Sequence, residues 1–268
     1  MYKKVEITNQ FKLTKKQKQL LSDLAHDLTL IKKSASFLDD IVVRGGFLLD
    51  VLLNSEPFDV DLLYTTKEQI GKLFSKCRCE ELRNAVKDLD FKVMVKKYEI
   101  DFGHFGLGEL YMSPTDKTVG FHSHQKEINS QLSLDSDGRL WGNARSIQGI
   151  KDKVHEVRFE GWLLYPYFIR EFPHIDYYFN FTSMCLRGLK MIYTKKYKSV
   201  GPNYRNMLDN ARPILDFVLT VPQYLTDLKK YYKAKCRNMS KQEIRKALKV
   251  TKANNQEYLY KTFVRMLF

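Results

Sequence analysis

The segment from Ile41 to Tyr64 constrains the fold more than any other part of the chain. It reads IVVRGG, FLLDVLL, NSEP and FDVDLLY in order. The first piece predicts a short buried strand that ends in a glycine pair, and the second suits a buried helix that opens directly after the glycines. NSEP is typical of a turn, and the alternation in the last piece predicts another strand. We therefore expect a compact strand–helix–strand unit here.

Two aspartates and two glycines in this segment are residue types that suit phosphate chemistry. Asp59 and Asp61 are two residues apart on a predicted strand, so both carboxylates point to one face. Adjacent carboxylates repel each other unless a cation lies between them, and oxygen ligands of this kind suit Mg²⁺. Gly45 and Gly46 lack a Cβ, so backbone N–H groups there can approach a phosphate closely. Alone, each pair is more often a solvated strand end or a simple turn.

In this order and spacing, Gly45, Gly46, Asp50, Asp59 and Asp61 resemble the head domain of the tRNA nucleotidyltransferase/poly(A) polymerase family, within the DNA polymerase beta-type nucleotidyltransferase fold. That family shows Gly-Gly-x-x-Arg-Asp, a short apolar helix, a turn and Asp-x-Asp. Further along, DSDGRLWG and IQGIKDKVHEVRF resemble the end of the head, and CLRGLKMIYTKKY and GPNYRNMLDNARPIL resemble neck and body helices. The resemblance is specific in 41–64 and covers most of 41–235.

The resemblance implies a catalytic site for two-metal nucleotidyl transfer, with two Mg²⁺ ions and an NTP, ATP and/or CTP, as substrate. It requires a third carboxylate on a neighbouring strand, for which we choose Asp101, with Glu99 in reserve. The candidate catalytic and metal-binding residues are Asp59, Asp61 and Asp101. The candidate nucleotide-binding residues are Arg44, Gly45, Gly46, Asp50, Lys126 and Asn129.

The sequence departs from the family pattern in three places. Leu49 stands where the family has an arginine, and in 123–129 only Ile128 and Asn129 clearly match. The segment 180–184, NFTSM, lacks the acidic residue and the arginine that read the incoming base in the family. Nucleotide choice is therefore not implied, and a catalytically inactive RNA-binding relative is an alternative. For Lys126, a phosphate contact and a solvated loop both remain open.

The net positive charge of the chain arises entirely from its C-terminal part. The net charge is +14, and residues 186–268 hold 19 Lys/Arg against 5 Asp/Glu. Residues 229–252 interleave basic side chains with Tyr231 and Tyr232, a pattern suited to phosphate neutralisation and base stacking. We expect an RNA partner, with a solvated helix face as the alternative. The candidate RNA-binding residues are Lys229, Lys230, Lys233, Lys235 and Arg237.

These patterns together predict an α+β fold class in two domains. We expect a polymerase beta-like nucleotidyltransferase head over residues 1–158, with a mixed or antiparallel sheet and helices, and a basic all-helical neck and body over 159–268. Hydrophobic spacing predicts helices at 16–33, 67–87, 178–196, 203–219, 222–235 and 241–249. Hairpins are expected at 91–105 and at 132–142, the second turning at Asp137–Gly138.

The remaining features concern the redox compartment and the cellular location of the protein. The four cysteines lack the spacing of a zinc site, so we interpret them as free thiols in a reducing compartment. No apolar run approaches the roughly 20 residues needed to cross a bilayer. We expect a cytoplasmic protein with no membrane partner that adds nucleotides from an NTP to an RNA 3′ end, such as a tRNA or tRNA-like end, without a template. An alternative is a toxin-like nucleotidyltransferase that modifies a protein or small molecule.

Overall fold

The structure, a computed structural model, describes residues 5–55, 57, 59–66, 79–94, 99–104, 127–157, 177–236 and 238–268. The chain divides into two compact units. The first comprises Met1–Gln125 and Asn129–Gln148, and the second comprises Lys126–Ile128 and Gly149–Phe268. Each unit is described by itself below.

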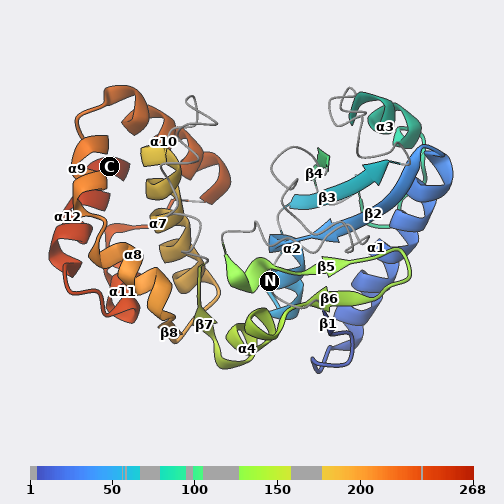
Figure 1. The fold of residues 1–268 in the computed structure, drawn as a ribbon, viewed down its shortest axis with the longest axis horizontal. Coiled ribbons are helices and arrows are strands. Elements are labelled where there is room, and N and C mark those ends of the chain that lie inside the picture. Colours follow the sequence, from blue (N-terminus) through green and yellow to red (C-terminus); the bar gives the residue numbers. More distant parts are fainter. Residues whose placement is uncertain are drawn as a thin grey trace. The chain divides into compact units, whose positions relative to one another are not determined.

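The first unit is built on one six-stranded sheet (Figure 1). In spatial order its strands are β1 (Val5–Glu6), β6 (Leu140–Gly142), β5 (Ser133–Leu134), β2 (Leu38–Arg44), β3 (Asp59–Thr66) and β4 (Glu99–His104). The pair β3–β4 is parallel, and the other four neighbouring pairs are antiparallel. The mixed sheet therefore places β3 between an antiparallel and a parallel partner.

Helices join and cover the strands of this unit. They are α1 (Lys15–Ser34), α2 (Gly46–Leu52), α3 (Cys79–Val86), the 3-10 helix η3 (Ile128–Ser130) and α4 (Ala144–Asp152), and both η3 and α4 include residues of the two units. Helix α1 begins with a capping box between Thr14 and Gln17, which satisfies free N–H groups at the helix start. Its apolar side, with Leu24, Leu28 and Ile31 fully buried, packs against β2 and α3.

The structure confirms several local predictions for this unit. The predicted strands at 41–46 and 58–64 correspond to β2 and β3, and the helix between them is α2. The predicted hairpin at 132–142 is the antiparallel pair β5–β6, with Gly138 at φ +78° in its turn. Of the helix predicted at 67–87, the described part is α3. The strand predicted at 98–105 pairs in parallel with β3, which the sequence did not predict.

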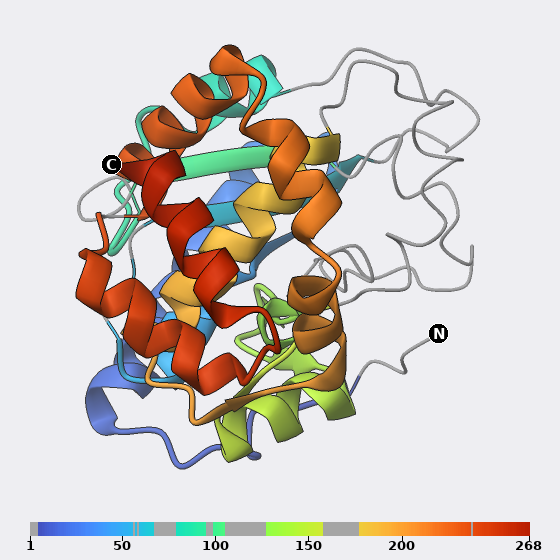
Figure 2. The same ribbon diagram turned by 90° about the vertical axis from the view of Figure 1, so that its left-hand side faces the viewer.

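The second unit is helical. Its helices are α7 (Tyr177–Thr194), α8 (Pro202–Asp209), α9 (Arg212–Val218), α10 (Pro222–Cys236), α11 (Lys241–Thr251) and α12 (Gln256–Leu267), and two short strands, β7 (Val154–His155) and β8 (Ser199–Val200), pair in parallel. Helix α7 packs against α9, α10 and α11, and α12 packs against α10 and α11 (Figure 2). The helix predicted at 203–219 is two helices, α8 and α9, with Pro213 in the first turn of α9. Helix α12 was not predicted.

Close approach of α7 and α8 depends on a glycine. A Cβ at Gly188 of α7 would lie 2.4 Å from ring atoms of Tyr204 in α8, so no other residue fits without displacement. The Tyr204 hydroxyl donates a hydrogen bond of 2.8 Å to the carbonyl oxygen of Cys185. Cys185 is a free, buried cysteine, as predicted, and burial raises the pKa of its thiol.

The predicted α+β fold class is confirmed, because a sheet with helices precedes a helical C-terminal part. Among the described residues, no helix combines the length and the apolar character that crossing a bilayer requires.

Candidate functional site

The predicted catalytic positions are brought side by side by the register of the parallel pair β3–β4. Asp61 is the Cα partner of Asp101, and Asp59 is the Cα partner of Glu99. Register partners in neighbouring strands share a face, and so do residues two apart in one strand. These four positions therefore occupy one face of the sheet, on backbones about 4.8 Å apart.

The alternation of β3 places Asp61 on the face opposite Val60 and Leu62, a face that is apolar further along, where Leu63 is buried against Val42. Val60, Leu62 and Tyr64 are fully buried, whereas the side chain of Asp61 is half-buried. Because burial of alternate apolar side chains fixes the register, a shift of one residue would move the aspartate positions into the core. The core packing therefore holds Asp59 and Asp61 on the opposite face from Val60 and Leu62.

One row of polar residues crosses four strands at this level. Ser133 on β5 is the register partner of Arg44 on β2, Arg44 is the partner of Asp61 on β3, and Asp61 is the partner of Asp101 on β4. We call Ser133, Arg44, Asp61 and Asp101 the polar row. The adjacent row is apolar, since Leu134, Val43 and Leu62 are register partners and are fully buried. The polar row therefore brings a serine, a guanidinium and two aspartate positions side by side.

Two atoms of the polar row are buried without a hydrogen-bond partner. They are Nε of Arg44 and Oγ of Ser133, and within the described structure neither atom is paired. Buried polar atoms are rarely left unpaired, because each costs free energy until a partner, a water, an ion or a ligand is supplied. The Arg44–Ser133 end of the row thus offers a cation and a hydroxyl to an anionic group. Sequence reasoning missed Ser133, whose signal is a serine between two leucines of a buried strand.

The glycine pair forms the turn between β2 and α2. Gly45 has φ +73° and ψ −130°, a conformation that favours glycine, and its N–H donates to the carbonyl oxygen of Leu132 at 3.0 Å. Gly46 opens α2, and a Cβ built there meets no atom within 4 Å. The turn next to Arg44 therefore has open space at Gly46, which a closely approaching group can occupy.

Helix α2 explains one departure from the family pattern. Leu49, at the position of the family's arginine, is fully buried together with Phe47 and Leu48. A buried leucine cannot contact phosphate, so Leu49 belongs to the core. Asp50, the next residue, is half-buried on the same helix, and its carbonyl oxygen accepts a hydrogen bond of 2.8 Å from Ser55 N–H.

The other predicted nucleotide-binding residues lie upstream of β5. Asn129 is fully buried in η3, and it begins a buried polar stretch with Ser130, Gln131 and Ser133. Lys126 lies outside the described residues. Within the described side chains, no three acidic, histidine or cysteine groups are placed to hold a metal ion, and the side chains of Asp59, Glu99 and Asp101 lie outside that set.

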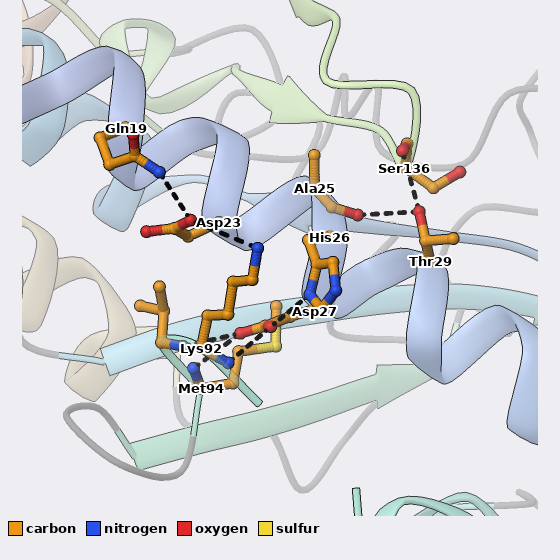
Figure 3. Close-up of polar contacts among 10 residues, drawn as sticks. Gln19, Asp23, Ala25, His26, Asp27, Thr29, Lys92, Met94 and Ser136 are labelled. Carbon is orange, nitrogen blue, oxygen red and sulfur yellow. Dashed lines mark hydrogen bonds and ion pairs between the residues drawn. The ribbon is translucent and has the colours of Figure 1, made fainter. Parts of the chain in front are cut away.

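A buried carboxylate on α1 anchors the chain ahead of β4 (Figure 3). Asp27 is fully buried, and its oxygens accept hydrogen bonds from the backbone N–H groups of Lys92, Val93 and Met94 at 2.8, 2.9 and 3.0 Å. His26 Nδ1 lies 3.4 Å from the same carboxylate. Three charge-assisted hydrogen bonds fix the segment 92–94, which leads into the strand of Asp101.

Sequence reasoning missed Asp27, although a signal was present. The residue stands beside Leu24, Leu28 and Ile31 on the apolar side of an amphipathic helix. A carboxylate at such a position is buried only when it is paired or hydrogen-bonded, so its presence indicates an unidentified partner.

The predicted RNA-binding residues lie on and just after α10. Lys230 and Lys233 are exposed and Lys229 is half-buried, and helical spacing places the three on one face. Lys235 follows Lys233 by two residues, about 200° around the helix, so it belongs to a different face. Its side chain and all of Arg237 lie outside the described set.

The tyrosines of α10 do not form the predicted pair of stacking surfaces. Tyr232 is buried in the helical unit, with 3% of its surface exposed, so it is a core residue. Tyr231 is half-buried and makes an edge contact with Phe179 of α7, with ring centroids 6.3 Å apart. Interpreting both as exposed was wrong for Tyr232, because the interleaving of Lys and Tyr does not distinguish the two sides of a helix.

Comparison with known proteins identifies the fold. No family model matches the chain, and no curated protein matches it. It is similar to a solved CCA-adding enzyme in complex with CTP (TM-score 0.53, 14% identity, 96% of this chain and 55% of the other). It is also similar to a CCA-adding enzyme in complex with ATP (TM-score 0.52, 14% identity, 98% of this chain and 54% of the other). A third similar structure is an apo tRNA-processing enzyme (TM-score 0.51, 14% identity, 89% of this chain and 59% of the other).

These similarities extend over nearly the whole chain, which spans just over half the length of the enzymes it matches. At 14% identity they establish the architecture and not the activity. The chain therefore has the fold of the CCA-adding enzymes, as the motif in residues 41–64 predicted.

Proposed function

We propose that the protein is a template-independent nucleotidyltransferase that adds nucleotides from an NTP to an RNA 3′ end. The observation that carries this proposal is the register of the carboxylate positions, with Asp61 beside Asp101 and Asp59 beside Glu99 on adjacent strands. Such a set on one face of a sheet suits a pair of hard divalent cations. We assign the reaction to a head over residues 1–158 and the acceptor to the basic part over 159–268.

Asp59, Asp61 and Asp101 would hold two Mg²⁺ ions. When bound, these ions would supply charge stabilisation for the attacking and leaving oxygens. The Asp101 carboxylate also accepts the proton of the RNA 3′-hydroxyl. The hydroxyl oxygen then forms a bond to the α-phosphorus of the NTP, and the bond between that phosphorus and the bridging oxygen of pyrophosphate breaks.

The turn after β2 orients the triphosphate in this proposal. The open space at Gly46 admits phosphate oxygens close to the backbone, and Arg44 supplies a positive charge next to Asp61 in the polar row. The unpaired Nε of Arg44 and Oγ of Ser133 support this placement, because an anion would satisfy them. Asp50, Lys126 and Asn129 remain candidates for contacts with the nucleotide.

The acceptor is an RNA with a tRNA or tRNA-like 3′ end in this proposal. Support comes from the excess of 19 Lys/Arg over 5 Asp/Glu in residues 186–268 and from the fold shared with CCA-adding enzymes. The candidate contacts are Lys229, Lys230, Lys233, Lys235 and Arg237. CTP and ATP are the nucleotides to test first, since related structures hold them.

The test is incubation of the protein with intact tRNA and with tRNA trimmed at its 3′ end, each NTP separately and Mg²⁺, read by product length. We expect extension of trimmed tRNA by CTP or ATP. A parallel reaction without RNA, with radiolabelled NTPs, detects modification of protein or small molecules. Label transfer only in the RNA-free reaction would overturn the RNA acceptor. Metal-dependent NTP binding without incorporation into any acceptor would indicate an inactive relative.

A further inference from the structure

Helix α11 presents a continuous basic side to solvent. Ile244, Ala247, Leu248 and Thr251 are buried against neighbouring helices, which include α7 and α12. On the opposite side all charged residues are basic and exposed. They are Lys241, Arg245, Lys246, Lys249 and, directly after the helix, Lys252, and we call them the α11 basic face.

The acidic residue of α11 lies at the start of the helix. Glu243 caps the helix start, and the hydrogen bond from the backbone N–H of Ser240 lowers the pKa of its carboxyl. The Tyr193 hydroxyl of α7 also hydrogen-bonds to this carboxylate. This carboxylate caps α11 and joins it to α7, and within the α11 basic face its charge also acts on Lys246.

Two basic side chains of the face are held by aromatic rings. The guanidinium carbon of Arg245 lies 3.8 Å from the ring centroid of Tyr260 in α12, and Nζ of Lys241 lies 5.5 Å from that of Phe268. Glu257 lies 3.8 Å from Arg245, but both side chains are more than half exposed, so this ion pair is weak. Stacking on Tyr260 restricts the guanidinium, which remains more than half exposed to solvent.

The dimensions and chemistry of the face fit a polyanion. Eleven helical residues span about 16 Å, over which several phosphates of a nucleic acid follow one another. A membrane surface is a poorer match, because membrane-binding helices insert their apolar side, and the apolar side of α11 is buried in the protein. The named side chains of the face are all cations on a convex, exposed helix surface, which suits contact with phosphate oxygens.

We infer that the α11 basic face binds the phosphate backbone of the RNA acceptor, independently of its sequence. This inference rests on the proposed function for the identity of the polyanion. It places RNA contacts beyond the α10 lysines, on a helix whose basic residues all face solvent.

The test is the affinity of a trimmed tRNA for the full-length chain, measured without NTP by fluorescence anisotropy over a KCl series. The variant Lys241→Gln/Lys246→Gln/Lys249→Gln removes three charges and keeps good helix formers. The matched control is Lys15→Gln/Lys16→Gln/Lys18→Gln, three exposed lysines at the start of α1. Thermal unfolding shows whether each variant remains folded.

For the α11 variant we expect roughly tenfold weaker binding at moderate salt and a salt slope lower by about 2. The α1 variant should bind like the wild type. Equal binding by the two variants, whether both are unchanged or both weakened, would overturn the inference. This binding assay contains no NTP, so its outcome does not depend on catalysis. Failure of the proposed function would appear in the separate tRNA extension assay, as absence of nucleotide incorporation by the wild type.

Discussion

Gly46 opens α2 at the turn after β2, where it leaves open space. A Cβ there meets no atom within 4 Å, and the φ of Gly46 is not positive, so the fold itself does not require glycine at this position. We predict that Gly46→Ala keeps the free energy of unfolding or raises it by up to about 1 kcal/mol. The same methyl group would meet the triphosphate and raise the KM for NTP about tenfold or more.

The matched change at the preceding residue separates strain from ligand contact. Gly45→Ala places alanine at φ +73° and should destabilise the protein by about 1–2 kcal/mol. Denaturant unfolding and steady-state kinetics measure both quantities. A Gly46→Ala variant with unchanged stability and unchanged KM would remove the glycine turn from the nucleotide site.

His155 makes the stability of the helical unit depend on pH. It is fully buried, neither ring nitrogen has a hydrogen-bond partner in the described structure, and Tyr204 packs edge-on at 4.9 Å. Burial lowers its pKa to about 4 from the usual 6.5, with Glu127 opposing this shift and Arg187 adding to it. Below pH 6.5 the unfolded chain therefore binds a proton that the folded chain excludes.

The stability that comes from keeping His155 neutral is fully present above pH 6.5, and it is lost as the pH falls through 4. The shift corresponds to about 3 kcal/mol. We predict that His155→Phe flattens the rise of unfolding free energy between pH 4 and 6.5, measured by urea titration at several pH values. Comparison with the wild type cancels the titration of the carboxylates. An identical slope in both proteins would show that folding does not lower the pKa of His155.

For single residues, the sequence predicted those roles that depend on neighbours along the chain. The glycine pair between β2 and α2 and the shared face of the Asp59 and Asp61 positions follow from local spacing. Ser133 and Tyr232 did not follow, because pairing with Arg44 and burial of a tyrosine are set by packing between distant segments. Lys126 and Arg237 stay predictions.

The elements around the site are joined by Asp27 of α1, which accepts three hydrogen bonds from the backbone of 92–94 (Figure 3). In Asp27→Asn, an amide NH₂ would face N–H donors that now meet a carboxylate oxygen. We predict a loss of about 3 kcal/mol in unfolding free energy, together with faster hydrogen exchange at Lys92, Val93 and Met94.

The control for this change is Asp23→Asn, a carboxyl-to-amide change on the same helix. Asp23 is partly exposed and lies 3.9 Å from Lys92 Nζ, so it should contribute less than about 1 kcal/mol. Equal effects of the two substitutions would contradict an anchoring role for Asp27.

Elements were predictable where hydrophobic periodicity is strong and local. β2, α2 and β3 follow the pattern of residues 41–64, and the glycine turn after Asp137 marks the β5–β6 hairpin. The parallel pairing of β4 with β3 was not predictable, since it joins positions about 40 residues apart without a local signal. The single helix expected at 203–219 is interrupted because Pro213 suits a first helical turn and not a helix interior.

For the whole molecule, the basic character of the C-terminal part is inseparable from its packing. Residues 186–268 carry the net charge of +14, yet Leu228, Leu248, Leu259, Phe263 and Met266 from the same region are fully buried or nearly so. Deleting the region would remove part of the core of the helical unit together with its charge. Substitution of exposed lysines is therefore the appropriate way to separate RNA affinity from folding.

The central claim is that the carboxylates of β3 and β4 carry out nucleotidyl transfer, and Asp61→Asn tests it most directly. Asp61 is half-buried and Asn has nearly the same size and shape, so the variant should fold. Asp39→Asn, an exposed change on β2, is the matched control. We predict that Asp61→Asn lowers the rate of nucleotide incorporation into trimmed tRNA at least about 100-fold. The incorporation rate of Asp39→Asn and the RNA affinity of both variants should stay at the wild-type level. Incorporation by Asp61→Asn at the rate of the control would contradict the assignment of the active site.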